Sequence, residues 1–358
     1  MTSGAPSQPS SAVTEEIIVR QQGRLGHLIL NRPRALNALT RQMVGEIKDR
    51  LEAWKDDDSV QTVLVSGAGE RGLCAGGDVL SVRTSALEGR PEEADEFFGT
   101  EYTMNSLISQ FPKPYVAFMD GLVLGGGVGV SAHGSHRIVT ERTRMGMPET
   151  GIGFFPDVGG TWLLSHTPSQ FGLHLGLTGE HISGADACAL GLADHYVPSD
   201  RLDELAQALE TTPADEAIAA VAEQAPPSEL WEHRPWIDSA YAQDTAEKIV
   251  AALQDHEDPA AQKAAETILS KSPTSVKVTL AAIRRARGLR SLQEALNVEY
   301  RITHHMMRGQ DMPEGIRAQL VDKDRNPQWS PATLEEVSAE TVDSYFAEPA
   351  GGDLGLRA

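Results

Sequence analysis

Two carboxylates, Glu149 and Asp157, stand in a glycine- and proline-rich stretch that spans residues 147–160. Each acid follows a proline, Pro148 or Pro156, whose fixed φ restricts how the acid approaches a ligand. Carboxylates held in this way can act as general acids, general bases or nucleophiles toward a bound substrate. Capping of a surface helix is the competing interpretation for Asp157, whereas Glu149 has no obvious capping role.

Glycine runs upstream of these acids expose main-chain N–H groups. Residues 125–127 are three glycines between an expected strand that ends near Met119 and an expected helix from Val128. A second pair, at residues 76–77, precedes Asp78 at an expected helix start. Without a Cβ, both places let N–H groups approach a ligand, although a tight turn or close packing would also explain each run alone. Together they favour an oxyanion hole beside an acid or base.

Other motifs fit known sites poorly. Residues 67–72 match the spacing of a dinucleotide fingerprint, but no helix is expected directly after them, so a flexible loop is the competing interpretation. Ser131 lacks the glycine that ends a nucleophile elbow. His133 and His136 could ligate a metal from one helix face, yet no third ligand is evident. The arginines within residues 284–290 are expected to form a solvated helix face, with a phosphate contact as the alternative.

Composition excludes several classes of function. The 358 residues carry a formal net charge of −20, with 31 Lys and Arg against 51 Asp and Glu. We expect such a chain to bind neither nucleic acid nor an anionic membrane, because both require a basic face. Hydrophobic residues at 40% indicate a globular protein with a large core. A small anionic ligand remains compatible with this charge, since a few basic groups suffice to hold it.

Cysteines and termini bear on location. Cys74 and Cys188 show no metal or disulfide spacing, so we expect a cytoplasmic protein with no metal and no other cofactor. Residues 1–14 are rich in Ser, Pro, Ala and Gly and lack the basic residues and the apolar run of a targeting peptide. They are therefore expected to be a disordered tail. No segment reaches the ~18 apolar residues typical of a membrane span.

The elements that must position the glycines and acids follow an α/β order. Residues 17–30 are typical of a hairpin, and Thr40 is a good N-cap for an amphipathic helix. Short apolar runs at 61–66 and 115–119 are typical of strands in a parallel sheet. Residues 15–200 are therefore predicted to form an α/β core that carries the site.

Strand signals disappear after Val197. Helical patterns follow at 201–209, 214–224, 240–253, 260–270, 274–287, 291–307 and 314–322. Residues 201–348 are predicted to form a helical C-terminal region, and residues 349–358 a frayed tail.

These motifs, spread from Glu16 to about Phe346, make the chain resemble the crotonase, or enoyl-CoA hydratase/isomerase, superfamily. Its general marks are Asn31-Arg-Pro with Leu36-Asn-Ala-Leu39, Cys74-Ala-Gly-Gly-Asp78, and Asp120-Gly with Gly125-Gly-Gly127. The 3-hydroxyisobutyryl-CoA hydrolase subgroup is the most similar, through Gly125-Gly-Gly-Val-Gly129, Met147-Pro-Glu-Thr150, Phe155-Pro-Asp-Val-Gly-Gly160, Ser272-Pro-Thr-Ser275, Glu299-Tyr-Arg301, Met307-Arg-Gly309 and Asp322-Lys-Asp324.

The resemblance implies a fold and a set of roles. The fold is a crotonase-like spiral of ββα units with C-terminal helices, assembled as a trimer or a multiple of it. The N–H groups of Gly77 and Gly126 would form the oxyanion hole for a thioester carbonyl of an acyl-CoA. Glu149 would be the principal catalytic carboxylate, and Asp157 its partner near the substrate's 3-hydroxyl. Glu101 matches a further substrate-contacting acid.

One departure from the family pattern bears on the reaction. Hydratases of the superfamily carry a first catalytic glutamate two residues after the Gly-Gly-Gly run, where this chain has Gly129. Hydration of a C=C bond needs acid/base groups that together handle both protons. We therefore predict a hydrolase for a short 3-hydroxyacyl-CoA, above all the 3-hydroxyisobutyryl-CoA of valine catabolism.

Two other hypotheses stay open. One is a hydratase or isomerase that uses Glu149 alone, and the other is a protein that binds CoA esters without turnover. Within the hydrolase hypothesis, Glu149 either activates a water or attacks the carbonyl to form an anhydride.

Overall fold

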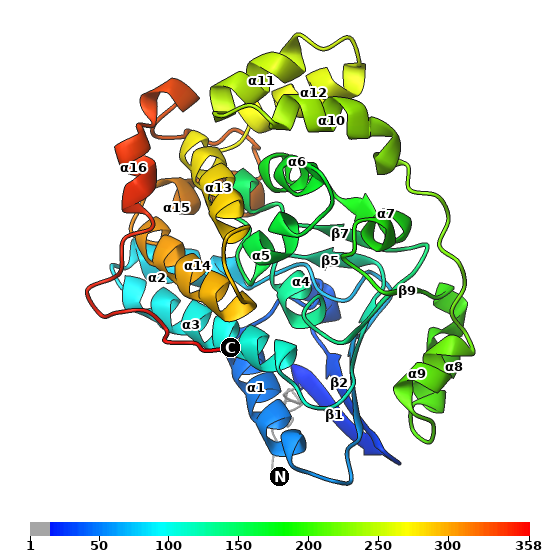
Figure 1. Cartoon of the computed structure of the whole chain (residues 1–358). Coiled ribbons are helices and arrows are strands. Elements are labelled where there is room, and N and C mark those ends of the chain that lie inside the picture. The colour runs from blue at the N-terminus through cyan, green and yellow to red at the C-terminus, as the bar shows by residue number, and fades with distance from the viewer. Residues whose placement is uncertain (1–14) are drawn as a thin grey trace, which may run out of the picture.

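The computed structural model describes residues 15–358, so the predicted disordered tail at 1–14 lies outside the described residues. Two sheets form the α/β part (Figure 1). The larger one has the order β1-β2-β3-β4-β6-β9, with β1 Ile17–Gln22, β2 Leu25–Leu30, β3 Thr62–Gly67, β4 Tyr115–Met119, β6 His136–Val139 and β9 His195–Tyr196. The smaller has the order β5-β7-β8, with β5 Leu122–Leu124, β7 Arg144–Gly146 and β8 Ile182–Ser183.

Helices connect and cover these strands. Those of the α/β part are α1 Arg41–Lys55, α2 Val79–Leu87, α3 Pro91–Ser109, α4 Gly126–Ser131, α5 Gly160–Ser165, α6 Phe171–Thr178 and α7 Gly184–Ala189. After β9 come α8 Leu202–Ala208, α9 Ala214–Ala219, α10 Arg234–Tyr241, α11 Ala246–Gln254, α12 Pro259–Leu269, α13 Pro273–Ala286, α14 Leu292–Met306, α15 Asp311–Ile316 and α16 Ala339–Ser344. Short 3-10 turns are η1 Pro33–Ala35, η2 Glu149–Ile152, η3 Ser199–Arg201, η4 Leu230–His233 and η6 Leu334–Glu336, and η5 Arg317–Val321 is a π-helical turn.

The first elements form as their sequences predict. β1 and β2 pair antiparallel around Gly23, whose φ of +56° suits a glycine in a tight turn. The hydroxyl of Thr40 accepts a hydrogen bond from the N–H of Met43 and so begins α1. The apolar stripe of α1, which includes Ile47 and Leu51, is fully buried.

The parallel sheet brings the two glycine runs together. β2, β3, β4 and β6 are parallel neighbours, so the segments that follow β3 and β4 leave the sheet at the same edge. These segments pair with each other through bridges at Gly72–Gly121 and Cys74–Val123. The glycines at 76–77 and those at 125–127 therefore lie side by side, although about fifty residues separate them in the chain.

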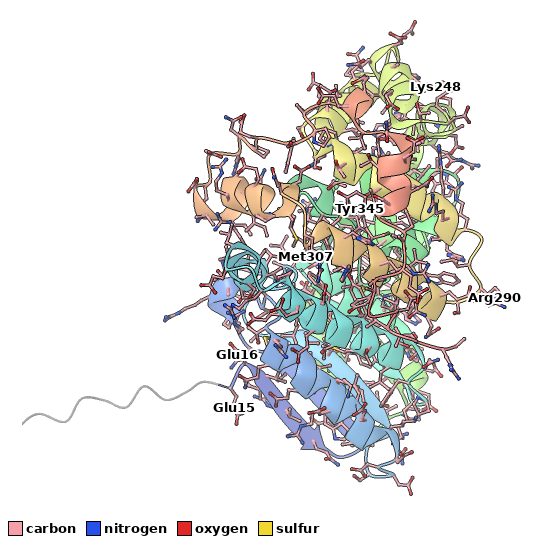
Figure 2. All side chains as sticks on the ribbon, turned by 90° about the vertical axis from the view of Figure 1, so that its left-hand side faces the viewer. Glu15, Glu16, Lys248, Arg290, Met307 and Tyr345 are labelled. Carbon is pink, nitrogen blue, oxygen red and sulfur yellow. The ribbon has the colours of Figure 1, made fainter. Side chains whose placement is uncertain are left out.

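Helices of the C-terminal region pack back onto the α/β part. Figure 2 shows α1, α3 and α14 side by side, and α14 packs along α3 while α15 contacts both α2 and η2. α8 and α9 instead cover the other face of the large sheet, where Leu205 and Ile218 are buried with strand residues such as Val116. The site-bearing core and the late helices thus share one structure.

Several details of the helical prediction were wrong. The helix expected over 214–224 ends at Ala219. The helix expected over 240–253 is two helices, because α10 ends at Tyr241 and the side chain of Thr245 caps the start of α11. The short helix α16 was not predicted, since its six residues are too few to show a periodic pattern.

The C-terminal segment is held, contrary to the predicted frayed tail at 349–358. Asn297 of α14 donates to the carbonyl of Leu356 (3.0 Å) and accepts from its N–H (3.1 Å). Arg301 pairs with Asp353 (Nε–Oδ1 2.7 Å), and Leu354 packs against the core. Figure 1 shows this segment in red running along α3 to the C-terminus. Apolar and charged anchors on a neighbouring helix, which no local pattern reveals, order the tail.

Candidate active site

Two glycines with unpaired main-chain N–H groups, Gly77 and Gly126, lie close together at the edge of the sheets. Gly77 bridges to Leu39, whose N–H and carbonyl bond Gly76 and Asp78, so the N–H of Gly77 is directed away from that strand. A Cβ built on Gly126 would lie 3.2 Å from the nitrogen of Gly77. Within residues 15–358, neither N–H donates to another group. This is the arrangement expected of an oxyanion hole.

The glycines at the start of α4 leave space for two acids. A Cβ on Gly125 would lie 2.6 Å from Oε1 of Glu149, and one on Gly126 would lie 2.8 Å from Oε1 of Glu101. Gly127 has a different reason, because its Cβ would stand 2.4 Å from the carbonyl oxygen of Cys74. Close packing therefore explains Gly127, while Gly125 and Gly126 border the functional groups.

Glu149 is placed by a tight 3-10 turn. It is the first residue of η2, is 7% exposed, and its Oε2 has no hydrogen-bond partner in the described part of the chain. Gly153 ends the turn at a φ of +74°, and α15 packs so close that a Cβ there would lie 2.4 Å from Asp311. The C-terminal region thus holds the backbone beneath Glu149.

Asp157 lies in a loop that α3 and α14 hold. The hydroxyl of Tyr102 donates to its Oδ2 (2.8 Å), so Asp157 does not act as the helix cap that its sequence also allowed. Glu299 accepts hydrogen bonds from the N–H groups of Gly159 (2.6 Å) and Thr161 (3.0 Å) and so ties the loop to α14. The loop contains strained backbone at residue 158, whose φ is +51°, and these bonds stabilise it.

Glu101 joins the site from α3. It is 1% exposed, and its Oε1 is unpaired within residues 15–358. The structure therefore brings together all five residues that the sequence analysis named: Gly77, Gly126, Glu101, Glu149 and Asp157.

Burial makes these acids hold their protons more tightly. Burial is the main reason why the pKa values of Glu149 and Glu101 lie well above their usual range. The charge of Asp157 raises both pKa values further. Burial likewise raises the pKa of Asp157 to about 7 and that of Glu299 to about 8. An acid whose pKa is raised can serve as a base only after it loses its proton at higher pH.

This coupling predicts a pH effect. Because the charge of Asp157 raises the pKa of Glu149, Asp157→Asn should lower that pKa. In a plot of kcat/KM for thioester hydrolysis against pH, we expect the rising limb of Asp157→Asn to lie at lower pH than that of the wild-type protein. A limb that stays in place or moves upward would show that Glu149 does not set the rising limb.

Several residues of the site were not predicted from the sequence. Tyr102, Asn105, Glu299 and Thr303 are buried around it, and Thr303 shares a hydrogen bond with the hydroxyl of Tyr102 (2.7 Å). For Tyr102 and Asn105 a signal was available on α3, where Phe98, Tyr102 and Asn105 share one helix face. A polar residue at a buried position of such a face marks either a paired core group or a site.

The remaining motifs take ordinary structural roles. Residues 67–72 form a turn with no helix directly after it, and the hydroxyl of Ser131 donates to the carbonyl of Gly127 (2.6 Å). His133 bonds the carbonyl of Val158. Across residues 15–358, no cluster of three or more His, Cys, Asp or Glu could hold a metal ion.

The charged motifs are likewise paired. Asp78 does not cap α2, because its carboxylate pairs with Arg32 (3.2 Å). In the arginine group, Arg284 donates to main-chain carbonyls, and Arg290 pairs with Glu294. This agrees with a solvated helix face.

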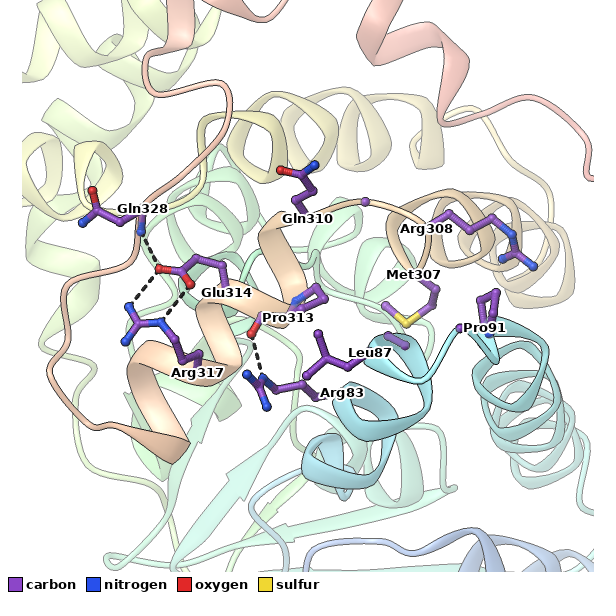
Figure 3. Close-up of a pocket in the computed structure, with 13 residues that line it drawn as sticks. Arg83, Leu87, Pro91, Met307, Arg308, Gln310, Pro313, Glu314, Arg317 and Gln328 are labelled. Carbon is purple, nitrogen blue, oxygen red and sulfur yellow. Dashed lines mark hydrogen bonds and ion pairs between the residues drawn. The ribbon is translucent and has the colours of Figure 1, made fainter.

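A groove of about 920 Å³ lies between α2 and α15, and none of Glu149, Glu101 and Asp157 lines it (Figure 3). Arg83 closes its floor by donating to the carbonyl of Pro313 (3.0 Å). Two other arginines line it, but Arg308 pairs with Asp95 and Arg317 pairs with Glu314.

No helix of the part that the structure describes is long and apolar enough to cross a membrane.

Comparison with known proteins identifies the family. The family model described as enoyl-CoA hydratase/isomerase matches residues 25–346. The chain belongs to the enoyl-CoA hydratase/isomerase family. It is 40% identical over 352 residues to the mitochondrial 3-hydroxyisobutyryl-CoA hydrolase of Xenopus tropicalis, covering 95% of this chain and 91% of the relative. The human mitochondrial 3-hydroxyisobutyryl-CoA hydrolase is 38% identical, covering 95% of this chain and 90% of the relative.

Solved structures confirm the crotonase-like fold. A carnitinyl-CoA dehydratase from Mycobacterium thermoresistibile superposes with a TM-score of 0.92 at 51% identity, covering 95% of this chain and 98% of that one. An enoyl-CoA hydratase from Rhodobacter sphaeroides superposes with a TM-score of 0.91 at 38% identity, covering 95% of this chain and 100% of that one. The predicted α/β core with C-terminal helices is thus the fold of this family.

The location expected from the sequence was wrong. The cytoplasmic location inferred from cysteine content is contradicted by the curated relatives, which are mitochondrial enzymes. Cysteine usage separates oxidising from reducing compartments and carries no information about the organelle.

Proposed function

We propose that this protein hydrolyses the thioester of 3-hydroxyisobutyryl-CoA to release 3-hydroxyisobutyrate and CoA. The observation that carries the proposal is a pair of unpaired N–H groups, on Gly77 and Gly126, beside the buried carboxyl of Glu149. Relatives at 38–40% identity over 95% of the chain are named 3-hydroxyisobutyryl-CoA hydrolases, which supports the substrate. The reaction needs no metal or other cofactor beyond the CoA of the substrate, so activity should survive dialysis against a chelator.

The oxyanion hole would bind the thioester oxygen. Negative charge develops on that oxygen as the carbonyl carbon becomes tetrahedral, and the N–H groups of Gly77 and Gly126 would stabilise it. Each donor contributes ~2.7–4 kcal/mol to catalysis in comparable sites.

Glu149 would drive the cleavage of the thioester. As a general base it takes a proton from a water that attacks the carbonyl, and the CoA thiolate leaves. As a nucleophile it attacks the carbonyl itself, and water then hydrolyses the resulting anhydride. Oε1 stands next to Gly125 at the start of α4, close to the oxyanion donors, which suits either route.

Residue 129 favours hydrolysis over hydration. A Cβ on Gly129 would lie 2.7 Å from Cβ of Val158 and 2.9 Å from Nδ2 of Asn105, so a larger side chain has no room there. A second acid is therefore absent from the place where hydratases of the superfamily carry one. This supports the hydrolase over the alternative of a hydratase or isomerase that uses Glu149 alone.

The alternative has its own support and is directly testable. The two solved structures with TM-scores above 0.9 are described as a dehydratase and a hydratase. Incubation with crotonyl-CoA separates the hypotheses, because a hydratase removes the enoyl absorbance without releasing thiol. We expect thiol release from 3-hydroxyisobutyryl-CoA and a stable absorbance with crotonyl-CoA. The reverse result would establish the alternative.

Asp157 would select for the 3-hydroxyl group. A buried carboxylate left without its partner costs binding energy, so the site should disfavour acyl groups that lack a hydroxyl. We predict that Asp157→Asn loses more kcat/KM with 3-hydroxyisobutyryl-CoA than with isobutyryl-CoA. Equal losses with both substrates would remove Asp157 from substrate selection.

We propose in addition that the protein is a homo-oligomer, a trimer or a multiple of one. The proposal rests on the family resemblance. Light scattering coupled to size-exclusion chromatography would test it, and a mass near the 38.6 kDa of one chain would contradict it.

A further inference from the structure

One buried amide at the site has no partner. Asn105 of α3 is 0% exposed, and neither Nδ2 nor Oδ1 forms a hydrogen bond within residues 15–358. A buried polar group without a partner destabilises the folded state, so such a group calls for an explanation. Exchanging the two amide atoms changes nothing, because in either orientation both the NH₂ group and the carbonyl oxygen are without a partner.

Asn105 and Glu149 both lie against the glycines of α4 and its N-cap. The N–H of Gly129 donates to the carbonyl of Gly125 (3.1 Å), so the two glycines lie one helical turn apart on one face of α4. A Cβ built on Gly125 would meet Oε1 of Glu149, and a Cβ built on Gly129 would lie 2.9 Å from Nδ2 of Asn105. The amide of Asn105 therefore lies about one helical turn, or ~5 Å, further along α4 than the N-terminal end, which carries the N–H of Gly126.

Asp157 is held from the same stretch of α3, because Tyr102, three residues before Asn105, donates to its Oδ2. Its neighbour Val158 contacts the position of a Cβ on Gly129, as Asn105 does. An ionised Asp157 can only accept hydrogen bonds, and the hydroxyl of Tyr102 already donates to it. The hydroxyl of a bound alcohol would donate its proton to Asp157. Its oxygen could then accept a hydrogen bond from a further donor.

We propose that Asn105 is a specificity-determining residue whose amide N–H donates to the 3-hydroxyl oxygen of the acyl group. The substrate hydroxyl donates to Asp157 and accepts from Asn105, so both of its hydrogen-bonding functions are satisfied. The inference rests on the proposed function. The proposed role of Asn105 explains why α4 carries glycine at 129, since any side chain there would displace the amide of Asn105.

The test is a comparison of two substrates and two proteins. Asn105→Leu keeps the shape of the side chain and removes both hydrogen-bonding atoms. With 3-hydroxyisobutyryl-CoA we expect kcat/KM to fall by about tenfold to a hundredfold, as for a lost hydrogen bond to a substrate hydroxyl in a buried site. With isobutyryl-CoA, which has no 3-hydroxyl, we expect kcat/KM to stay close to the wild-type value.

A matched control and a melting curve separate this role from folding. Gln293 is also a buried amide against α3, but it donates to Ser106 and Ser109. Gln293→Leu should affect both substrates equally. Asn105→Leu should melt no lower than the wild type, because an apolar group replaces an unpaired amide. Equal losses with both substrates, or no loss with either, would overturn the proposal.

A binding experiment keeps the result independent of turnover. In a Glu149→Gln background, the affinity for 3-hydroxyisobutyryl-CoA should exceed that for isobutyryl-CoA, and Asn105→Leu should remove this preference. If the wild-type protein releases no thiol, the proposed function fails, while a preference that depends on Asn105 would still support its role. A hydroxyl preference that survives Asn105→Leu would overturn that role.

Discussion

Replacing Glu149 with glutamine is expected to lower the kcat of thiol release by about 10²–10⁴-fold, the range for loss of a general acid or base. The glutamine has the shape of the glutamate but can neither take the proton of a water nor attack a carbonyl. The measurement is release of free thiol from 3-hydroxyisobutyryl-CoA under saturating substrate. Because Glu149 is buried and its pKa is raised, loss of its charge should not destabilise the fold.

The control for this variant is binding without chemistry. Calorimetric titration with CoA, the product, should give the same affinity for the Glu149→Gln and wild-type proteins. Retained turnover of Glu149→Gln would refute the assigned role. Loss of CoA binding would mean that the variant disturbs the whole site.

The two routes open to Glu149 differ in where the oxygen of water ends. Turnover in ¹⁸O-labelled water, followed by mass spectrometry of the peptide that carries Glu149, detects an anhydride whose Glu149 carbonyl is attacked by water, because the label then enters the Glu149 carboxyl group. General-base catalysis leaves the label in the released acid alone.

Gly126→Ala is expected to have the second largest effect, about a 10²–10³-fold loss of kcat, as for removal of an oxyanion donor. The new Cβ would lie 2.8 Å from Oε1 of Glu101 and 3.2 Å from the nitrogen of Gly77, so it fills the space that the thioester oxygen needs. The measurement is the same thiol assay, together with thermal melting to show that the variant is folded.

Gly45→Ala is the matched control. Gly45 lies within α1, and a Cβ there would meet nothing within 4 Å. That substitution should leave kcat unchanged and stabilise the helix by up to ~1 kcal/mol. Thiol release by Gly126→Ala at the wild-type rate would show that the oxyanion is not bound at this position.

Local patterns predicted much of this protein. The hairpin of β1 and β2, the cap at Thr40 and the strands β3 and β4 depend on neighbouring residues, so their sequences indicate them. The glycine runs and the acids after Pro148 and Pro156 are equally local. Family resemblance added Glu101, which no motif of its own marks.

Contacts between distant segments could not be predicted in the same way. Tyr102 and Glu299 hold the loop of Asp157 from α3 and α14, and 142 residues separate Asp157 from Glu299. The held C-terminal segment also depends on neighbours far along the chain. Sequence periodicity shows which face of a helix is buried, but not what it is buried against.

By itself, then, the sequence determined the α/β order, the placement of exposed N–H groups and the absence of an acid at Gly129, because these are properties of residue types and their immediate neighbours. Only the tertiary structure decided that Gly77 and Gly126 meet, that the acids are buried together, and that the amide of Asn105 faces Gly129. The physical reason is that adjacent parallel strands bring distant loops to one edge, and burial then raises the pKa values of the acids that gather there.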